Sequence, residues 1–83
     1  MLKLKDIEVG SFIKVNDFKA LGTKALLFAN SPYKEKYEVY GVYVGEGEDD
    51  VSALSVILET KEDGNHLCGI IFEQDLHVIE LVK

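Results

Sequence analysis

The chain has 83 residues and a net charge of −6, from fifteen acidic residues and nine lysines, with no arginine. This length predicts one domain, residues 1–83, in which nearly every large apolar side chain serves the core and little room is left for an enclosed active site. The single cysteine excludes an internal disulfide, and no stretch is long and apolar enough for a signal peptide or a membrane span. We therefore expect a cytoplasmic protein without a membrane partner.

Charge is distributed unevenly along the chain. Residues 1–45 carry seven lysines and five acids, a net charge of +2, whereas residues 46–83 carry two lysines and ten acids, a net charge of −8. A protein that binds nucleic acid directly is expected to present a basic surface, and arginine is the residue best suited to phosphate contacts. The sequence therefore predicts a basic protein as partner and no direct contact with nucleic acid.

Two segments of different character open the chain. A turn over residues 6–10 leads into residues 11–15, whose alternating apolar side chains predict a first strand. In residues 16–36 the apolar side chains fall at helical spacing, and Asn16 or Asp17 is suited to cap a helix start. Gly22 and Thr23 interrupt this spacing. Residues 17–30 are therefore expected to hold an irregular segment with one short helix, and a short buried strand is the alternative there.

The run from Tyr37 to Gly47 gives the strongest strand signal, because β-branched and aromatic residues dominate it. Both alternating sets of positions are apolar, which predicts a strand covered on both faces. A glycine in such a run lets the strand bend or lets an aromatic ring pack closely. The two sets are Tyr37, Val39, Gly41 and Tyr43, and Tyr40, Val42 and Val44.

The rest of the chain predicts a meander of strands. After a polar turn at residues 46–50, alternation over residues 54–59 indicates a second long strand, and Asp63-Gly64 is typical of a hairpin turn. A return strand over residues 67–72, a polar corner at 73–75 and a last strand over 76–82 follow. The predicted fold is mainly β, either a small barrel or a strongly bent antiparallel sheet of about five strands.

These elements together resemble the small SH3-like barrels of many short bacterial and bacteriophage proteins. The resemblance rests on the strand led by Gly10, the long first connection, the meander, and the tight corner Glu73–Leu76 before the closing strand His77–Val82. It implies an SH3-like architecture. It does not extend to the ligand of eukaryotic SH3 domains, because the chain has no tryptophan and one proline, and an aromatic groove for proline-rich peptides is not recognisable.

The acidic residues of the second half cluster in two predicted turns, which we expect to lie close together if the strands pair as predicted. Such turns are either ordinary solvated loops or an interaction surface. A row of carboxylates on a rigid fold imitates the phosphate charges of a nucleic acid and fits the basic groove of a protein that binds one. The candidate binding residues in these turns are Glu46, Glu48, Asp49, Asp50, Glu62 and Asp63.

Two tyrosines complete the candidate binding surface. Tyr33 and Tyr37 lie near Lys34 and Lys36 at the beginning of the central run. An exposed tyrosine flanked by charges is typical of an interface hot spot, whereas the ordinary alternative is a packed ring with its hydroxyl at the surface. We predict that Tyr33 and Tyr37 act as anchors.

His66, Cys68 and His77 are the residues that suggest catalysis or transition-metal binding. His66 and Cys68 share one face of a strand, but two ligands without paired-cysteine spacing do not complete a zinc site. Cys68 lies in a hydrophobic strand, where a neutral buried thiol is the ordinary state. The sequence therefore predicts no catalytic residue, no metal and no cofactor.

These observations predict a non-enzymatic, acidic protein-binding module, most specifically a regulator or inhibitor of a nucleic-acid-handling protein, of the kind that small phage accessory or anti-defence proteins are. The alternative is a structural subunit of a homo- or hetero-oligomeric assembly. A small enzyme with Cys68 and a histidine, and a direct nucleic-acid binder, are further alternatives. The latter would need a face built from Lys14, Lys19, Lys24, Lys34 and Lys36.

Overall fold

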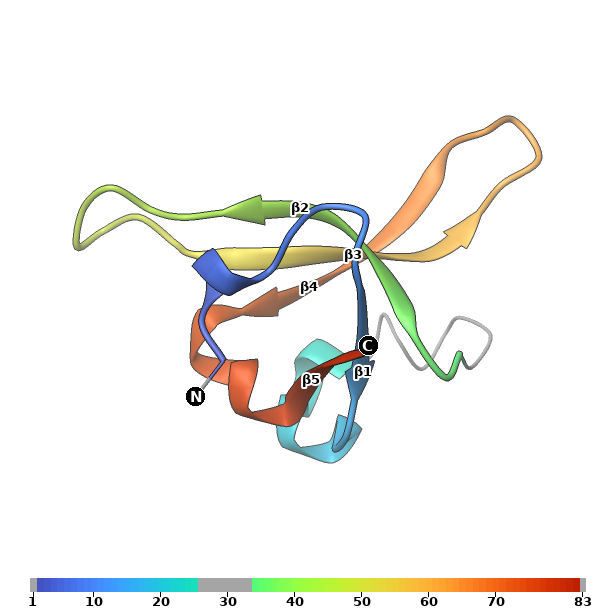
Figure 1. Cartoon of the computed structure of the whole chain (residues 1–83). Helices are drawn as coiled ribbons and strands as arrows, with labels where there is room; N and C mark the ends of the chain where they lie inside the picture. Colours follow the sequence, from blue (N-terminus) through green and yellow to red (C-terminus); the bar gives the residue numbers. More distant parts are fainter. Residues whose placement is uncertain (1, 26–33, 83) are drawn as a thin grey trace.

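The computed structural model describes residues 2–25 and 34–82, in which five antiparallel strands form one sheet in the order β4-β3-β2-β1-β5 (Figure 1). The predicted mainly β fold is confirmed as a bent sheet, which does not close within these residues. The strands are β1 (Phe12–Val15), β2 (Tyr37–Tyr43), β3 (Ala53–Thr60), β4 (His66–Phe72) and β5 (Ile79–Val82). Short 3₁₀ helices are η1 (Leu4–Asp6), η2 (Phe18–Ala25) and η3 (Glu73–Val78). In the same ranges, no helix has the length and apolar character needed to cross a membrane.

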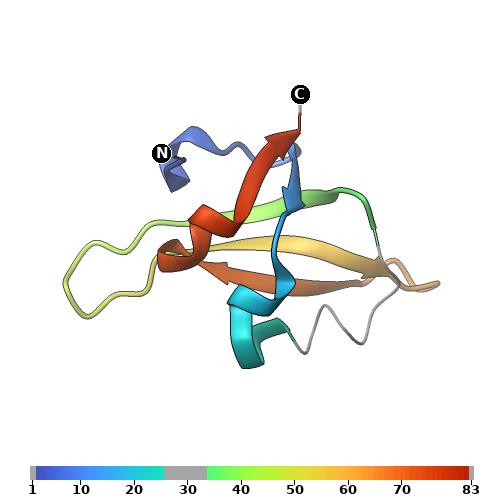
Figure 2. The ribbon, with the colours of Figure 1, turned by 90° about the horizontal axis from the view of Figure 1, so that it is seen from below.

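Strand β2 joins the two parts of the sheet because its pairing partner changes along its length. Its first residues pair with β1, with Tyr37 opposite Ile13, and the rest pair with β3. The register shifts by one residue between Val39 and Gly41, so Tyr40 is an extra residue on β2. Such a bulge bends a strand and increases its twist. As a result β1 and β5 run across the direction of β3 and β4 (Figure 2).

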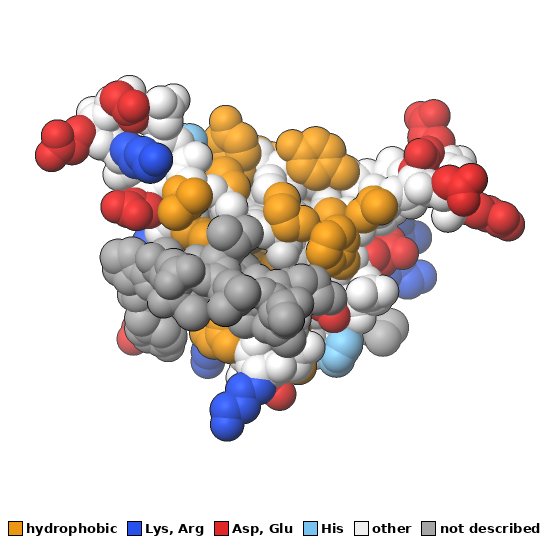
Figure 3. Space-filling view, turned by 180° about the vertical axis from the view of Figure 1, so that it is seen from behind, with side chains coloured by type: hydrophobic (Ala, Val, Ile, Leu, Met, Phe, Trp, Pro, Cys, Tyr) orange, Lys and Arg blue, Asp and Glu red, His pale blue; other side chains and the backbone are white. Residues whose placement is uncertain are grey.

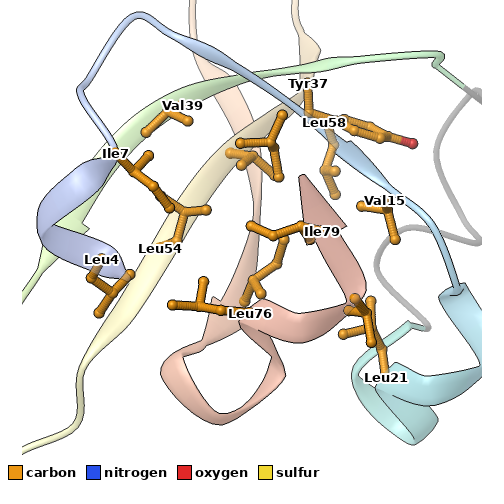
Figure 4. Packing of buried hydrophobic residues seen from close by; sticks show 14 residues of the cluster. Leu4, Ile7, Val15, Leu21, Tyr37, Val39, Leu54, Leu58, Leu76 and Ile79 are labelled. Atoms are coloured by element: carbon orange, nitrogen blue, oxygen red, sulfur yellow. The ribbon is translucent and has the colours of Figure 1, made fainter. Parts of the chain in front are cut away.

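The core fills the space between the β2–β3–β4 layer and the crossing pair β1 and β5 (Figure 4). Alternate side chains of β3 enter it, and Leu21 from η2 and Leu76 from η3 cover its open side. Full burial of one leucine, isoleucine or valine side chain stabilises the folded state by roughly 1.5–3 kcal/mol. The core residues are Leu4, Ile7, Ile13, Val15, Leu21, Tyr37, Val39, Leu54, Val56, Leu58, Ile71, Leu76, Val78 and Ile79.

The expected short helix in residues 17–30 is η2. Asp17 caps it, because its Oδ1 accepts hydrogen bonds from the backbone N of Lys19 (3.1 Å) and of Ala20 (3.3 Å). Leu21 of η2 is buried in the core, and the partly buried Phe18 packs against the core. The part of the predicted segment from 26 to 30 lies outside the described residues.

Two predicted boundaries change in the structure. The central strand ends at Tyr43 instead of Gly47, and it is not covered on both faces, since Tyr40, Tyr43 and Val44 are exposed. The last strand begins at Ile79, because the preceding residues form η3. Burial of alternating residues is therefore not specific to a strand: Leu76 and Val78 reach the core from a 3₁₀ turn.

Candidate protein-binding surface

The loop between β2 and β3 is an ordered acidic turn, called here the β2–β3 tip (Glu46, Glu48, Asp49 and Asp50). The Asp50 carboxylate Oδ2 closes the turn by accepting hydrogen bonds from the backbone N of Glu46 (3.2 Å) and of Gly47 (3.1 Å). Gly45 leaves no room for a side chain, since a Cβ there would lie 2.6 Å from the Cβ of Asp50. The Asp50 carboxylate therefore stabilises the turn, and the carboxylates of the other three acids are exposed.

The loop between β3 and β4, the β3–β4 tip (Glu62 and Asp63), is the predicted hairpin turn. Gly64 has the positive φ, +89°, that the Asp63-Gly64 pair predicts. The Asp63 carboxylate accepts hydrogen bonds from the backbone N and from the Nδ2 of Asn65, both at 2.9 Å. Asp63 is thus occupied in forming the turn, while Glu62 is exposed.

The two tips lie at opposite ends of the β2–β3–β4 layer (Figure 1). The β2–β3 tip precedes Ala53 and the β3–β4 tip follows Thr60, so the eight residues of β3 separate them. At about 3.3 Å per residue this is roughly 26 Å. The expectation that the acidic turns lie close together is therefore wrong, because successive hairpins of a meander turn at alternate ends of the sheet.

The structure does not support Tyr37 as a surface anchor. Tyr37 is only 2 % exposed, and its ring lies in the core with Val39 and Ile13. The prediction for this residue is wrong because Tyr37 lies on the same face of β2 as the buried Val39, and this face is turned to the core. Tyr33 lies outside the described residues.

Two other tyrosines, Tyr40 and Tyr43, are exposed by 52 % and 57 %, and they lie on the face of the β2–β3–β4 layer turned away from the core. We call this the outer face. Apart from the bulge residue Tyr40, its members belong to strand pairs that alternate with the core pairs. Its larger apolar residues are Tyr40, Tyr43, Ile57, Cys68, Ile70 and Phe72.

Sequence alternation places Tyr43 on the wrong face of β2, because the extra residue at Tyr40 exchanges the two faces for every residue that follows it. Without it, Tyr43 would lie on the same face as Tyr37 and Val39; with it, Val42 turns to the core and Tyr43 turns outward. The glycine after Tyr40 is a signal of a bulge, since glycine inside a strand is typical of one. That signal predicts a bend without giving the position of the extra residue.

The two histidines that suggested metal or thiol chemistry have hydrogen-bond partners of their own. His66 Nδ1 shares a hydrogen bond with Thr60 Oγ1 (2.8 Å), and His77 Nδ1–H donates one to the Gln74 carbonyl (3.1 Å). Burial raises the pKa of the Cys68 thiol, which disfavours the thiolate that a nucleophile requires. Across residues 2–25 and 34–82 no three of the possible ligand side chains come together as a metal site.

An open cleft of about 590 Å³ lies beside the N-terminal segment. Leu2, Lys3 and Lys5 line it together with Gln74 and His77 of η3. The two lysines are exposed. Flexible surface lysines do not fix a charge in a defined place, so the cleft does not specify a class of ligand.

Comparisons of the chain with protein-family models, with curated proteins and with solved structures find no match. The class that the structure itself defines is a small β protein with two acidic tips on either side of an exposed apolar face. Its function therefore has to be inferred from the chemistry of that surface.

Proposed function

We propose that this chain is a non-enzymatic protein-binding module whose partner presents a basic surface. The observation that carries the proposal is the pair of acidic tips at the two ends of β3. Within the described ranges, the exposed carboxylates of Glu46, Glu48, Asp49 and Glu62 make no ion pair, and the side chain of none of them has a hydrogen bond. Exposed carboxylates on ordered turns attract and orient a partner of opposite charge, most strongly at the β2–β3 tip, because the β3–β4 turn also carries the exposed Lys61.

The more specific form of the proposal is a regulator or inhibitor of a nucleic-acid-handling protein in the cytoplasm, similar in role to small phage accessory proteins. Proteins that hold nucleic acid do so through a basic surface, which an acidic protein can occupy instead. The length of β3 between the tips, about 26 Å, supports this form, because carboxylates beyond both ends of the strand contact a basic surface over a length at least comparable to most of one turn of a DNA duplex.

The proposed architecture is SH3-like. Three features support it: the strand order β4-β3-β2-β1-β5, the bend where β2 passes from β1 to β3, and the 3₁₀ turn η3 immediately before β5. In this arrangement the β2–β3 and β3–β4 loops extend from a rigid layer. Loops of that kind carry binding residues in many folds.

The proposal is tested by affinity capture from the cell of origin, with the captured proteins identified by mass. We expect a protein with a basic surface, captured at low salt and released as salt screens the charges. An excess of double-stranded DNA should compete with the capture if the partner handles nucleic acid. A variant with neutralised tips should lose the capture; it carries Glu46→Gln, Glu48→Gln, Asp49→Asn and Glu62→Gln.

The matched control changes the net charge by the same amount away from the tips. It carries Glu8→Gln, Glu35→Gln, Glu73→Gln and Glu80→Gln, all at exposed positions. Asp50 and Asp63 are left unchanged in both variants because their carboxylates form the turns. Equal capture by the tip variant and by the native protein would contradict the proposal.

A further inference from the structure

The outer face is an apolar surface with acidic residues at both ends. Tyr40 and Tyr43 of β2 and Ile70 of β4 are its exposed members, while Cys68 and Phe72 are half-buried and Ile57 is buried. Figure 3 shows hydrophobic side chains gathered between the two acidic tips. An apolar centre with a charged rim is the usual composition of a protein-binding site.

The rings of both tyrosines are held in place by contacts within the protein itself. Tyr43 packs across Gly41, where a Cβ would lie 3.0 Å from the tyrosine hydroxyl and 3.2 Å from its Cε2. The Tyr40 ring meets the His66 ring edge-on, with 5.3 Å between centroids, and His66 is held by its hydrogen bond with Thr60. An ordered aromatic side chain loses little conformational entropy on binding, which suits both residues to act as anchors.

The backbone of the outer face restricts the form of what binds there. Strand β3 pairs with β2 on one side and with β4 on the other, so its N–H and C=O groups are used within the sheet. A partner segment that lies on this face cannot form backbone hydrogen bonds with β3. Its own N–H and C=O groups must therefore be hydrogen-bonded within the segment. A helix does so, whereas an extended segment does not.

The charge of the two tips restricts what binds further. A second copy of this chain placed on the outer face would bring its own acidic tips, and a net charge of −6, against the same surface. Like charges brought together at an interface oppose association. Lysine or arginine near each end of the bound helix is instead attracted by the exposed acids of both tips.

We propose that the outer face binds an amphipathic helix of the partner protein, with an apolar stripe for Tyr40, Tyr43 and Ile70 and basic residues at both ends. The basic ends lie at least about 17 residues apart, since the roughly 26 Å of β3 between the tips corresponds to that length at 1.5 Å per helical residue. This inference rests on the proposed function, because it assumes a basic partner. Beyond the proposed function, the inference specifies an apolar contact on the outer face and a helical ligand.

Three synthetic peptides of about 21 residues test it against the full chain, by anisotropy of a fluorescent label. The first has leucines at helical spacing with a lysine run at each end. The second keeps the lysines and replaces every leucine by glutamine. The third keeps the leucines and replaces every lysine by glutamate. We expect only the first to bind tightly, and its circular dichroism to show added helix on binding.

Variants of the full chain locate the contact. Tyr43→Ser and Ile70→Ser should each weaken the first peptide about tenfold, as expected for a contact at the centre of an interface. Val9→Ser is the matched control, because Val9 is also largely exposed but lies in the turn before β1. Urea unfolding of each variant verifies that the fold is kept. The tip-neutralised variant should weaken binding and remove its dependence on salt.

The outcomes separate this inference from the proposed function. Equal binding of the first two peptides, unchanged by Tyr43→Ser, would overturn the outer-face site and leave a purely acidic contact. Equal binding of the first and third peptides would overturn both, because charge would then not matter. No binding by any of the three would overturn the helical ligand, and capture from the cell would decide the proposed function alone.

Sedimentation of the protein alone tests the remaining occupant of the outer face. We expect a monomer mass that does not change with concentration. A dimer that Tyr43→Ser dissociates, and that Val9→Ser leaves intact, would assign the outer face to a second copy and overturn the inference.

Discussion

The two faces of the β2–β3–β4 layer are made by the same strands and are both apolar, yet they differ in how far they are buried. On one face, Val39, Leu54 and Val56 are fully buried because β1, β5 and the 3₁₀ turns cover them. On the other, Tyr40 and Tyr43 remain more than half exposed within the described part of the chain. Hydrophobicity alone therefore does not identify the core of a small sheet; the elements that cross the sheet determine which face is buried.

The strongest test of this difference compares two tyrosines of the same strand. Tyr37→Ala should lower the free energy of unfolding by about 3–5 kcal/mol, as loss of a buried aromatic ring does. That is a large part of the stability of a small domain. Tyr43→Ala should cost no more than about 1 kcal/mol, because the ring is 57 % exposed. Urea unfolding followed by circular dichroism measures both.

A similar cost for Tyr37→Ala and Tyr43→Ala would mean that both faces of β2 contribute equally to the core. The assignment of Tyr43 to the outer face would then be wrong. The contribution of Tyr43 to peptide binding should be measured only in variants whose unfolding curve is close to that of the native protein.

The next test concerns the β2–β3 tip, at one end of the outer face. Gly45→Ala should destabilise the protein by about 1–3 kcal/mol, because its Cβ would lie 2.6 Å from the Cβ and 2.8 Å from the carbonyl oxygen of Asp50. Gly47→Ala is the matched control, since its Cβ would lie at an ordinary 3.7 Å from the Asp50 carboxylate. Thermal unfolding compares the two. Equal midpoints would show that the tip is not ordered by this close approach.

The β3–β4 tip, at the other end, depends on glycine for a different reason. A Cβ on Gly64 meets no atom within 4 Å, but its φ of +89° is strained for other residues. Gly64→Ala should therefore cost about 1–2 kcal/mol. Gly64→Asn should cost less, because asparagine tolerates positive φ better. Chemical denaturation of both variants tests this order, and an equal loss in both would point to a steric cause instead.

Much of the fold can be predicted from local patterns, but the candidate binding surface can be predicted less well. The strands, the Asp63-Gly64 turn and the cap at Asp17 are local features, encoded within a few residues of one another. The face occupied by Tyr43 depends on one extra residue at Tyr40, which reverses the alternation that follows. The burial of Tyr37 depends on β1 and β5, far away in the sequence. The distance between the acidic tips likewise required the register of β3.

The last and smallest effect concerns Cys68, which lies on the outer face and whose pKa burial raises. A thiol whose pKa is higher in the folded than in the unfolded protein makes the folded state less favourable once the unfolded thiol ionises. Its effect on stability is therefore absent well below pH 9.0, the ordinary value, and grows as the pH rises through that value. Relative to Cys68→Ala, the native protein should lose stability over that range.

Urea unfolding of the native protein and of Cys68→Ala between neutral and alkaline pH measures this loss. The lysines and tyrosines that also titrate there are common to both proteins, so their effects cancel in the difference between the two curves. A difference that stays constant with pH would show that the Cys68 thiol is as well solvated in the folded chain as in the unfolded one. The outer face would then be open to water even at its centre, between Ile57 and Ile70, and the apolar contact inferred for it would be correspondingly weaker.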